Sequence, residues 1–334
     1  MGHRANLIVV SEAPGYELYY THWGASTLDS SLFWGPERAL AFMRRQRPVA
    51  EGADWLDEVW AEGGAVLDLK ARKLIWFGGE DVQLEVLLRR VHLGIMRELW
   101  AGWHVEWASA GVADLARYVG VPVEPLLRRF VPYDPVLQDP DEPAWISYVV
   151  SLREHGRFKI QAQDGDPFEL ALCGPKLLGA LRAATLPDRY DYAARSSDFP
   201  CGGVHVDADA TRIDVWCAYP NADPVRRLRD AWPVWEVAWH FDRYEAVGEV
   251  LGDRLVLPAQ NANDLVANVR SIVLRPPRNR GGVAHEVGRR LAAKGREVSI
   301  SPFALRDDPP DPPDQNAART FDEAVARWRA RTST

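Results

Sequence analysis

The sequence has few cysteines and no long apolar run. Its three cysteines, Cys173, Cys201 and Cys217, are too few and too irregularly spaced for a disulfide framework or a zinc cluster. The N-terminal apolar run, residues 7–10, is shorter than the core of a signal peptide, and no window approaches the ~20 apolar residues of a membrane span. We therefore expect a cytoplasmic protein that does not cross a membrane.

The chain also lacks an excess of positive charge and several enzyme signatures. A net charge of −7 argues against bulk affinity for nucleic acid or an anionic membrane, because both need clustered positive charge. There is no Gly-x-Ser-x-Gly elbow, and His285-Glu286 is not a zincin motif because Arg289 occupies the place of the second histidine. The sequence points to no particular cofactor and to no metal site.

What the chain does contain is a repeated hairpin. In residues 63–79, two apolar β-type runs flank a polar turn and are bracketed by glycine pairs, and a weaker copy occurs at residues 202–216. A Gly-Pro pair stands 28 positions before the opening glycines of each copy, at Gly35-Pro36 and Gly174-Pro175. The equal spacing predicts a duplicated unit.

The tryptophans follow the same repeat. The matching sets are Trp100, Trp103, Trp107 and Gly120 in the first copy, and Trp232, Trp235, Trp239 and Gly252 in the second. Because only 14 of 334 residues are tryptophan, three coincidences at one offset have a chance probability on the order of one in ten thousand. Residues 4–120 therefore align with residues 145–252 after short insertions and deletions.

We predict an α+β protein with two tandem, degenerate repeats of a ββααββαβα unit and a C-terminal extension. The predicted parts are a first repeat (1–120), a Pro-rich linker (121–144), a second, eroded repeat (145–252), an α/β extension (253–306), and a Pro/Asp linker with a docking helix (307–334).

Local patterns predict the individual elements. The first repeat should contain strands over 5–11 and 16–23, a helix from Pro36, a short helix capped by Asp54, and a long helix from Glu80. The second should contain a helix capped by Asp223. The extension should contain strands at 254–257, 269–274 and 298–301, a helix at 283–294, and a final helix opened by a Thr320/Glu323 capping box.

One difference between the repeats indicates a site. The first copy has His22-Trp23-Gly24 where the second has Gln163-Asp164-Gly165, so the glycine is shared and the His-Trp pair is not. A duplicated protein with one working copy would lose site residues and keep fold residues. The alternative is that His22 and Trp23 are simply packed at the end of a strand.

Two carboxylates in the first copy form a second candidate. On a helix, Glu58 and Glu62 would share one face, and two such groups can act as general acid and base or hold a divalent metal. The alternative is a solvated helical face, on which such charges are common. In the second copy Cys201, His205 and Asp207 suggest a thiol nucleophile, although turn chemistry explains the aspartate equally well.

Aromatic and basic residues indicate binding. Trp23, Trp34 and Trp60 are candidates for exposed aromatic surface beside acidic side chains, which is typical of protein interfaces. Arg275, Arg278 and Arg280 precede Gly281-Gly282 and a predicted helix start. Arginines and helix N-terminal amides suit an anion, so the segment from Arg275 to Gly282 is a candidate anion site.

The opening Met1-Gly2-His3-Arg4-Ala5-Asn6, followed by His22-Trp23-Gly24, resembles an uncharacterised, largely actinobacterial group of proteins. Its members begin Met-Gly-x-Arg-Ala and carry a downstream His-Trp-Gly or His-Trp-Asp. The resemblance covers mainly the first 120 residues. The group has no assigned activity, so the resemblance implies no catalytic residue.

Two functional hypotheses follow. The first is a cytoplasmic binding protein whose acidic, tryptophan-rich surface recognises a macromolecular partner, for example in toxin neutralisation. The second is a hydrolase or small-molecule-binding enzyme with its site around His22, Glu58 and Glu62. The second requires these three side chains to converge in a concave pocket.

Overall fold

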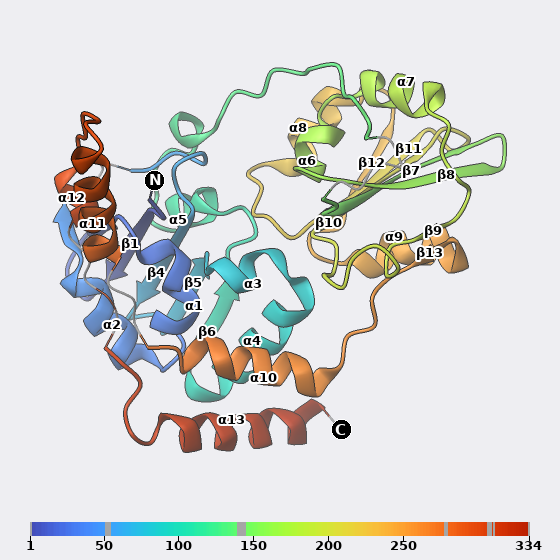
Figure 1. The fold of residues 1–334 in the computed structure, drawn as a ribbon. Helices are drawn as coiled ribbons and strands as arrows, with labels where there is room; N and C mark the ends of the chain where they lie inside the picture. Colours follow the sequence, from blue (N-terminus) through green and yellow to red (C-terminus); the bar gives the residue numbers. More distant parts are fainter. Residues whose placement is uncertain are drawn as a thin grey trace. The chain divides into compact units, whose positions relative to one another are not determined.

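A computed structural model describes residues 2–50, 55–138, 145–276, 280–305, 309 and 311–332, with the backbone alone at residue 280. The chain divides into two compact units (Figure 1). The first comprises residues 1–83, 87–128 and 262–334, and the second residues 84–86 and 129–261. Each unit contains a mixed sheet with helices packed on it, so the protein is α+β as predicted.

The first unit is built on a six-stranded sheet with the order β3-β2-β1-β4-β5-β6. The strands are β1 (Ala5–Val10), β2 (Glu17–Thr21), β3 (Arg47–Val49), β4 (Gly63–Asp68), β5 (Lys73–Phe77) and β6 (His104–Trp107). Neighbours are antiparallel except for the β1/β4 and β5/β6 pairs. Both predicted hairpins of the first repeat are confirmed.

Helices cover this sheet. They are α1 (Leu28–Ser31), α2 (Pro36–Arg45), α3 (Glu80–Leu84), α4 (Val86–Leu99), α5 (Val112–Tyr118), α10 (Ala262–Val273), α11 (Arg280–Ala293), α12 (Pro302–Leu305) and α13 (Ala317–Thr332). A 3-10 turn over Gly24–Thr27 leads from β2 into α1. Pro36 occupies the first turn of α2, where a missing N–H costs nothing, as expected.

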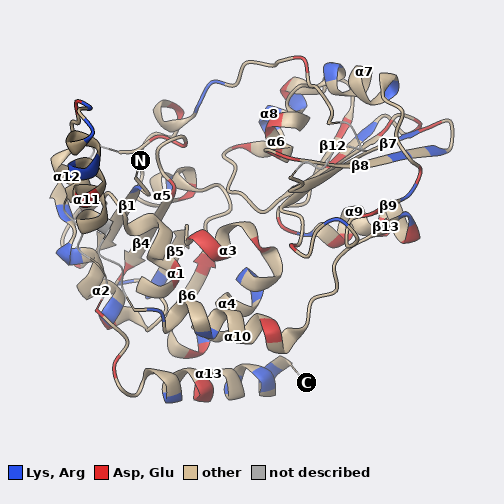
Figure 2. Ribbon diagram, viewed as in Figure 1, with Lys and Arg blue, Asp and Glu red and all other residues tan. Residues whose placement is uncertain are grey.

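The predicted docking helix is α13, which runs beside α4 and carries interspersed charges (Figures 1 and 2). Phe321 is buried in the core, and the Trp328 indole fills the space over Gly94, where an added Cβ would lie 2.4 Å from Nε1. Because α13 begins at Ala317, Thr320 lies inside the helix, and the predicted capping box is wrong.

The second unit has a five-stranded sheet with the order β12-β11-β10-β7-β8. Its strands are β7 (Tyr148–Glu154), β8 (Arg157–Gln163), β10 (Gly202–Asp207), β11 (Arg212–Cys217) and β12 (Glu236–Trp239). The order and the directions equal those of β6-β5-β4-β1-β2 in the first unit. This is the arrangement that a duplicated unit predicts.

The remaining elements of the second unit are short. They are α6 (Pro167–Ala171), α7 (Pro175–Ala183), α8 (Pro224–Ala231), α9 (Tyr244–Leu251), and the paired strands β9 (Tyr190–Asp191) and β13 (Leu255–Val256). Asp223 precedes α8 but its side chain makes no capping hydrogen bond, so that predicted cap is wrong.

The repeated tryptophans have the same role in both units. The buried Trp100 indole donates from Nε1 to the carbonyl oxygen of Leu32 at 3.0 Å, and the buried Trp232 indole donates to that of Ala171 at 2.7 Å. In each case the indole ties the C-terminal end of one helix, α4 or α8, to the C-terminal end of a short helix, α1 or α6. The spacing of the tryptophans therefore reflects a shared packing requirement.

Four predicted elements differ in the structure. The long helix expected from Glu80 is interrupted at residue 85 and forms α3 and α4. Residues 58–60 form a turn instead of a helix, because the Asp57 carboxylate accepts hydrogen bonds from the backbone N–H groups of Val59 and Trp60. The predicted cap, Asp54, lies outside the described residues. Residues 269–273 belong to helix α10, and residues 298–301 form no strand. None of the described helices has the length and apolar character needed to cross a membrane.

Candidate functional site

The first unit contains a cavity of about 800 Å³, here called the His22 cavity. Its lining comprises His3, Arg4, His22, Trp23, Glu80, Val283, Ala284, Val287, Gly288, Leu291, Val298, Ser299, Ile300, Ser301 and Ala304. One wall comes from the N-terminal segment and the end of β2, and the other from α11, α12 and the segment between them. The volume lies in the range of small-molecule sites.

His22 is placed at this wall by the alternation of β2. Alternate residues of a strand share a face, so Tyr20 and His22 lie on one side, and the Tyr20 hydroxyl is 3.1 Å from His22 Nδ1. The His22 side chain is 8% exposed, and the ring of Trp23 stands edge-on to it at 4.9 Å. The His-Trp pair is thus packed and also lines a cavity.

The N-terminal segment fits against His22. The His3 N–H donates to the His22 carbonyl oxygen at 2.8 Å, and the His3 carbonyl accepts from the N–H of Ala25 at 2.9 Å. A Cβ added to Gly2 would lie 2.7 Å from His22 Nε2, so the close approach requires glycine. The Met-Gly-x-Arg-Ala and His-Trp-Gly stretches therefore meet in space.

The second unit repeats the strand pairing here without the histidine. Tyr148 pairs with Gln163 and Gly202 as Ala5 pairs with Thr21 and Gly63. The strand register therefore matches Asp164 with His22, one residue away from the match expected from the sequence. The Gln163 side chain accepts a hydrogen bond from the N–H of Gln138 in the linker at 2.9 Å. In either match the second copy has no histidine at the place of His22.

Arg4 brings a positive charge to the cavity wall. Its guanidinium lies 4.5 Å from the centre of the Trp60 ring. Its backbone N–H donates to Glu62 Oε2 at 2.9 Å. Burial raises the pKa of Tyr20, and the cations Arg4 and Arg47 oppose that shift. Arg4 therefore places a guanidinium at the cavity, and the Glu62 carboxylate lies beside the Arg4 backbone.

The opposite wall comes from the C-terminal extension, which lies beside the N-terminal strand (Figure 1). Trp23 Nε1 donates to the Ala304 carbonyl oxygen at 2.9 Å. The Phe303 ring packs edge-on to Tyr20 at 6.0 Å and under the Arg47 guanidinium at 4.4 Å. Gly288 lets Ile300 approach α11, because a Cβ there would lie 2.2 Å from the Ile300 side chain. These contacts hold the apolar side of the cavity opposite His22.

The three predicted catalytic residues have different partners. Glu58 Oε1 accepts from the N–H of Arg128 at 2.6 Å, whereas Glu62 is bound by the N–H of Arg4. Because residues 58–60 form a turn, the expected shared helical face of the two carboxylates is wrong. Of the three residues, only His22 belongs to the described lining of the cavity, whose acidic member is Glu80.

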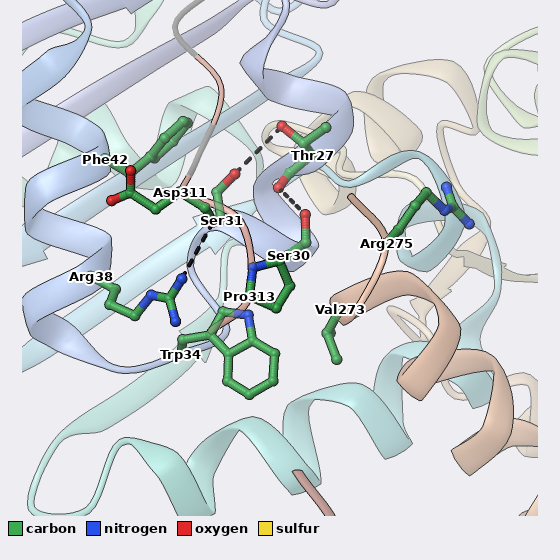
Figure 3. A pocket seen from close by; sticks show the side chains of 10 residues that line it. All are labelled: Thr27, Ser30, Ser31, Trp34, Arg38, Phe42, Val273, Arg275, Asp311 and Pro313. Atoms are coloured by element: carbon green, nitrogen blue, oxygen red, sulfur yellow. Dashed lines mark hydrogen bonds between the residues drawn. The ribbon is translucent and has the colours of Figure 1, made fainter. Parts of the chain in front are cut away.

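The predicted aromatic residues have three different environments. Trp23 lines the cavity, and Trp60 is 53% exposed beneath Arg4. Trp34 is partly buried and packs edge-on against Phe33 at 5.2 Å. It lines a smaller pocket of about 30 Å³, room for about one water, with the hydroxyl groups of α1 and the Arg38 side chain around it (Figure 3).

The predicted anion segment is described only in part. Arg275 also lines the smaller pocket, and its guanidinium pairs with Asp81 at 3.4 Å (Figure 3). Arg278 lies outside the described residues. Arg280 begins α11, and its side chain likewise lies outside what the structure describes. An anion site at Arg275–Gly282 therefore stays a prediction.

A buried polar pair, Asp29 and His92, lies near the acidic residues at the start of α3. Asp29 is 3% exposed, and burial, reinforced by the charges of Asp81 and Glu80, raises its pKa to about 7. His92 Nε2 lies 2.8 Å from the Asp29 carbonyl oxygen, and burial lowers the pKa of His92 to about 4. At pH 7, His92 is therefore neutral, whereas Asp29 changes its charge close to that pH.

The thiol hypothesis for the second unit does not hold. Cys201 is buried, and burial raises the pKa of its thiol to about 12, so it is not a thiolate at neutral pH. Asp207 accepts a hydrogen bond from the Ala210 N–H at 2.9 Å, which is turn chemistry. His205 Nδ1 instead lies 2.9 Å from the Ser151 hydroxyl, and both side chains are buried.

The cavity residues that sequence reasoning missed are His3, Arg4, Glu80 and the apolar face of α11. Within the described ranges, no three His, Cys, Asp or Glu side chains gather in a way that could hold a metal ion. No protein-family model matches the chain, and neither the curated proteins nor the solved structures give a significant match.

Proposed function

We propose that the protein binds a small molecule in the His22 cavity. The observation that supports this is the cavity itself, with about 800 Å³ of space between a polar wall and an apolar helix. Such a combination of apolar surface and a few convergent polar groups is typical of ligand sites. A cytoplasmic location, suggested by the sequence, is part of the proposal.

Binding fits the site better than hydrolysis does. A hydrolase of the predicted kind needs a carboxylate beside His22, either to orient the imidazole or to share acid and base work. Glu58 and Glu62 are instead engaged by backbone N–H groups of Arg128 and Arg4. The neighbour of the imidazole is the Tyr20 phenol, which packs His22 in place.

The test is a matched pair of tryptophan substitutions. Val287 on α11 lines the cavity and is 49% exposed, so Val287→Trp would fill the cavity from its open side with little damage to folding. Val250→Trp on α9, exposed at 41% and outside the cavity, is the control. Circular dichroism checks that both variants are folded.

The probe is 8-anilinonaphthalene-1-sulfonate, whose fluorescence rises in apolar sites. We expect saturable binding at one site per chain, weakened about tenfold or more by Val287→Trp and unchanged by Val250→Trp. Absence of saturable binding to the wild-type protein, or equal binding by both variants, would refute the proposal.

A second candidate function is recognition of a macromolecular partner, for example in toxin neutralisation. It is favoured by Trp60 and Val59, which are 53% and 47% exposed on the turn that follows Asp57. Exposed aromatic residues with an arginine alongside are common at the centre of protein interfaces. This proposal predicts a stoichiometric complex from the native host that Trp60→Ser abolishes and Trp145→Ser, at a site 85% exposed, leaves intact.

A further inference from the structure

The two walls of the His22 cavity differ in chemistry. One wall carries the Arg4 guanidinium and the polar residues His3 and His22, while α11 presents Val283, Val287 and Leu291 on the other. A ligand that satisfies both walls needs a polar head and an apolar body. From this juxtaposition we infer that the ligand is a carboxylate with an aliphatic tail. The inference rests on the proposed function of the cavity.

The preference for an anionic head follows from where the charges lie. Arg4 is partly buried over Trp60, so the interaction of its charge with a ligand is weakly screened. Glu80 carries the opposite charge but is exposed to solvent, where its repulsion is largely screened. The donors of the buried wall therefore dominate the recognition.

The tail would lie along α11. Val283, Val287 and Leu291 stand on one side of the helix at the i, i+4, i+8 spacing, and Val298, Ile300 and Ala304 continue the apolar surface. Val283 and Val287 are 62% and 49% exposed, so this side of α11 offers accessible apolar surface. Each methylene placed against this surface should tighten binding about fourfold.

The experiment compares three ligands of equal length, decanoate, decanol and decylamine, below their micellar concentrations. Isothermal titration calorimetry measures each affinity for the full-length protein at low salt. A charge-assisted hydrogen bond to the head should make decanoate bind about tenfold or more tightly than decanol. Octanoate should bind about fifteenfold more weakly than decanoate, because two methylenes are lost.

The Arg4→Gln variant tests the head group. It should remove the preference for decanoate over decanol and leave the affinity for decanol unchanged. Arg44→Gln on α2, whose guanidinium pairs with Glu17, is the control and should change neither affinity. If Arg4→Gln fails to fold, raising the salt concentration with the wild-type protein replaces it, because salt should weaken decanoate binding and spare decanol.

The outcomes separate this inference from the proposed function. Equal affinities for the three ligands, or tightest binding of decylamine, would overturn the inference of a carboxylate head group. Either result would leave the proposed small-molecule site in place. A decanoate preference that survives in Arg4→Gln would also overturn it. Failure of all three ligands and of 8-anilinonaphthalene-1-sulfonate to bind would overturn both.

Discussion

Replacement of Asp29 by asparagine should make the first unit more stable at alkaline pH. The Asp29 side chain is 3% exposed, and its Oδ1 accepts a hydrogen bond from the Ser30 N–H at 2.8 Å, which the asparagine oxygen can keep. What the substitution removes is the ionisable group, whose pKa burial raises from its ordinary 3.8 to about 7. Asp29→Asn is thus nearly isosteric and changes chiefly the charge.

The magnitude follows from proton linkage. A group whose pKa is higher in the folded state contributes stability at low pH and loses it as the pH rises through the folded value. A rise from 3.8 to about 7 corresponds to about 4 kcal/mol, of which about 3 kcal/mol is lost between pH 5 and pH 8. The free energy of unfolding of Asp29→Asn minus that of the wild type should therefore grow by about 3 kcal/mol over this interval.

Native-state hydrogen exchange is a suitable assay because the chain has two units and bulk unfolding would mix them. Amides of β1 and β4, in the core of the first unit, report its global opening, and those of β10 in the second unit serve as an internal control. If the free energy of unfolding of the variant minus that of the wild type stays constant from pH 5 to pH 8, the raised pKa of Asp29 is refuted.

Four further substitutions test the packing. Trp100→Phe and Trp232→Phe should each destabilise their own unit by about 1–3 kcal/mol, because each leaves a buried carbonyl without its indole donor. Hydrogen exchange measured separately for the two units gives both losses. A loss of stability in only one unit would contradict the equivalence of the two tryptophans. Gly94→Ala should displace Trp328 and expose α13 to limited proteolysis, and an unchanged cleavage pattern would count against the docking. Gly2→Ala should lower ligand affinity in the calorimetric assay by disturbing His22, whereas unchanged affinity would mean that the N-terminal segment is not part of the site.

The local pattern of the sequence was sufficient for the hairpins and the repeat. Alternation along β2 placed Tyr20 and His22 on one face, and glycine and tryptophan spacing matched two sheets of equal strand order. These features depend on neighbours in sequence or on identical units, so a pattern of residue types carries them. The same holds for α13, whose apolar stripe packs into the core.

Other features depended on tertiary contacts. Residues 269–273 are rich in β-branched side chains and resemble a strand, but Leu265, Val269 and Ile272 lie on one side of a helix that packs into the first unit. The turn at residues 58–60 was missed because the Asp57 side chain competes with helix formation. Tertiary packing thus overrode the strand propensity of residues 269–273, and local side-chain hydrogen bonds overrode the helical pattern at residues 58–60.

Sequence reasoning pointed to one of the two walls of the candidate site. The asymmetry between the copies pointed to His22 and Trp23, which do line the cavity. The opposite wall comes from α11 and residues 298–304, more than 250 positions away in the chain, and no local pattern links them to His22. The expected partners Glu58 and Glu62 were chosen on helical spacing, which the turn removes.

The most direct test of a ligand site at His22 is a crystal structure of the protein with decanoate. The account predicts the carboxylate within hydrogen-bonding distance of donors on the wall formed by His3, Arg4 and His22, and the aliphatic chain along Val283 and Val287 of α11. Decanoate bound elsewhere, or a structure in which α11 packs directly on His22 and leaves no room for a ligand, would contradict it.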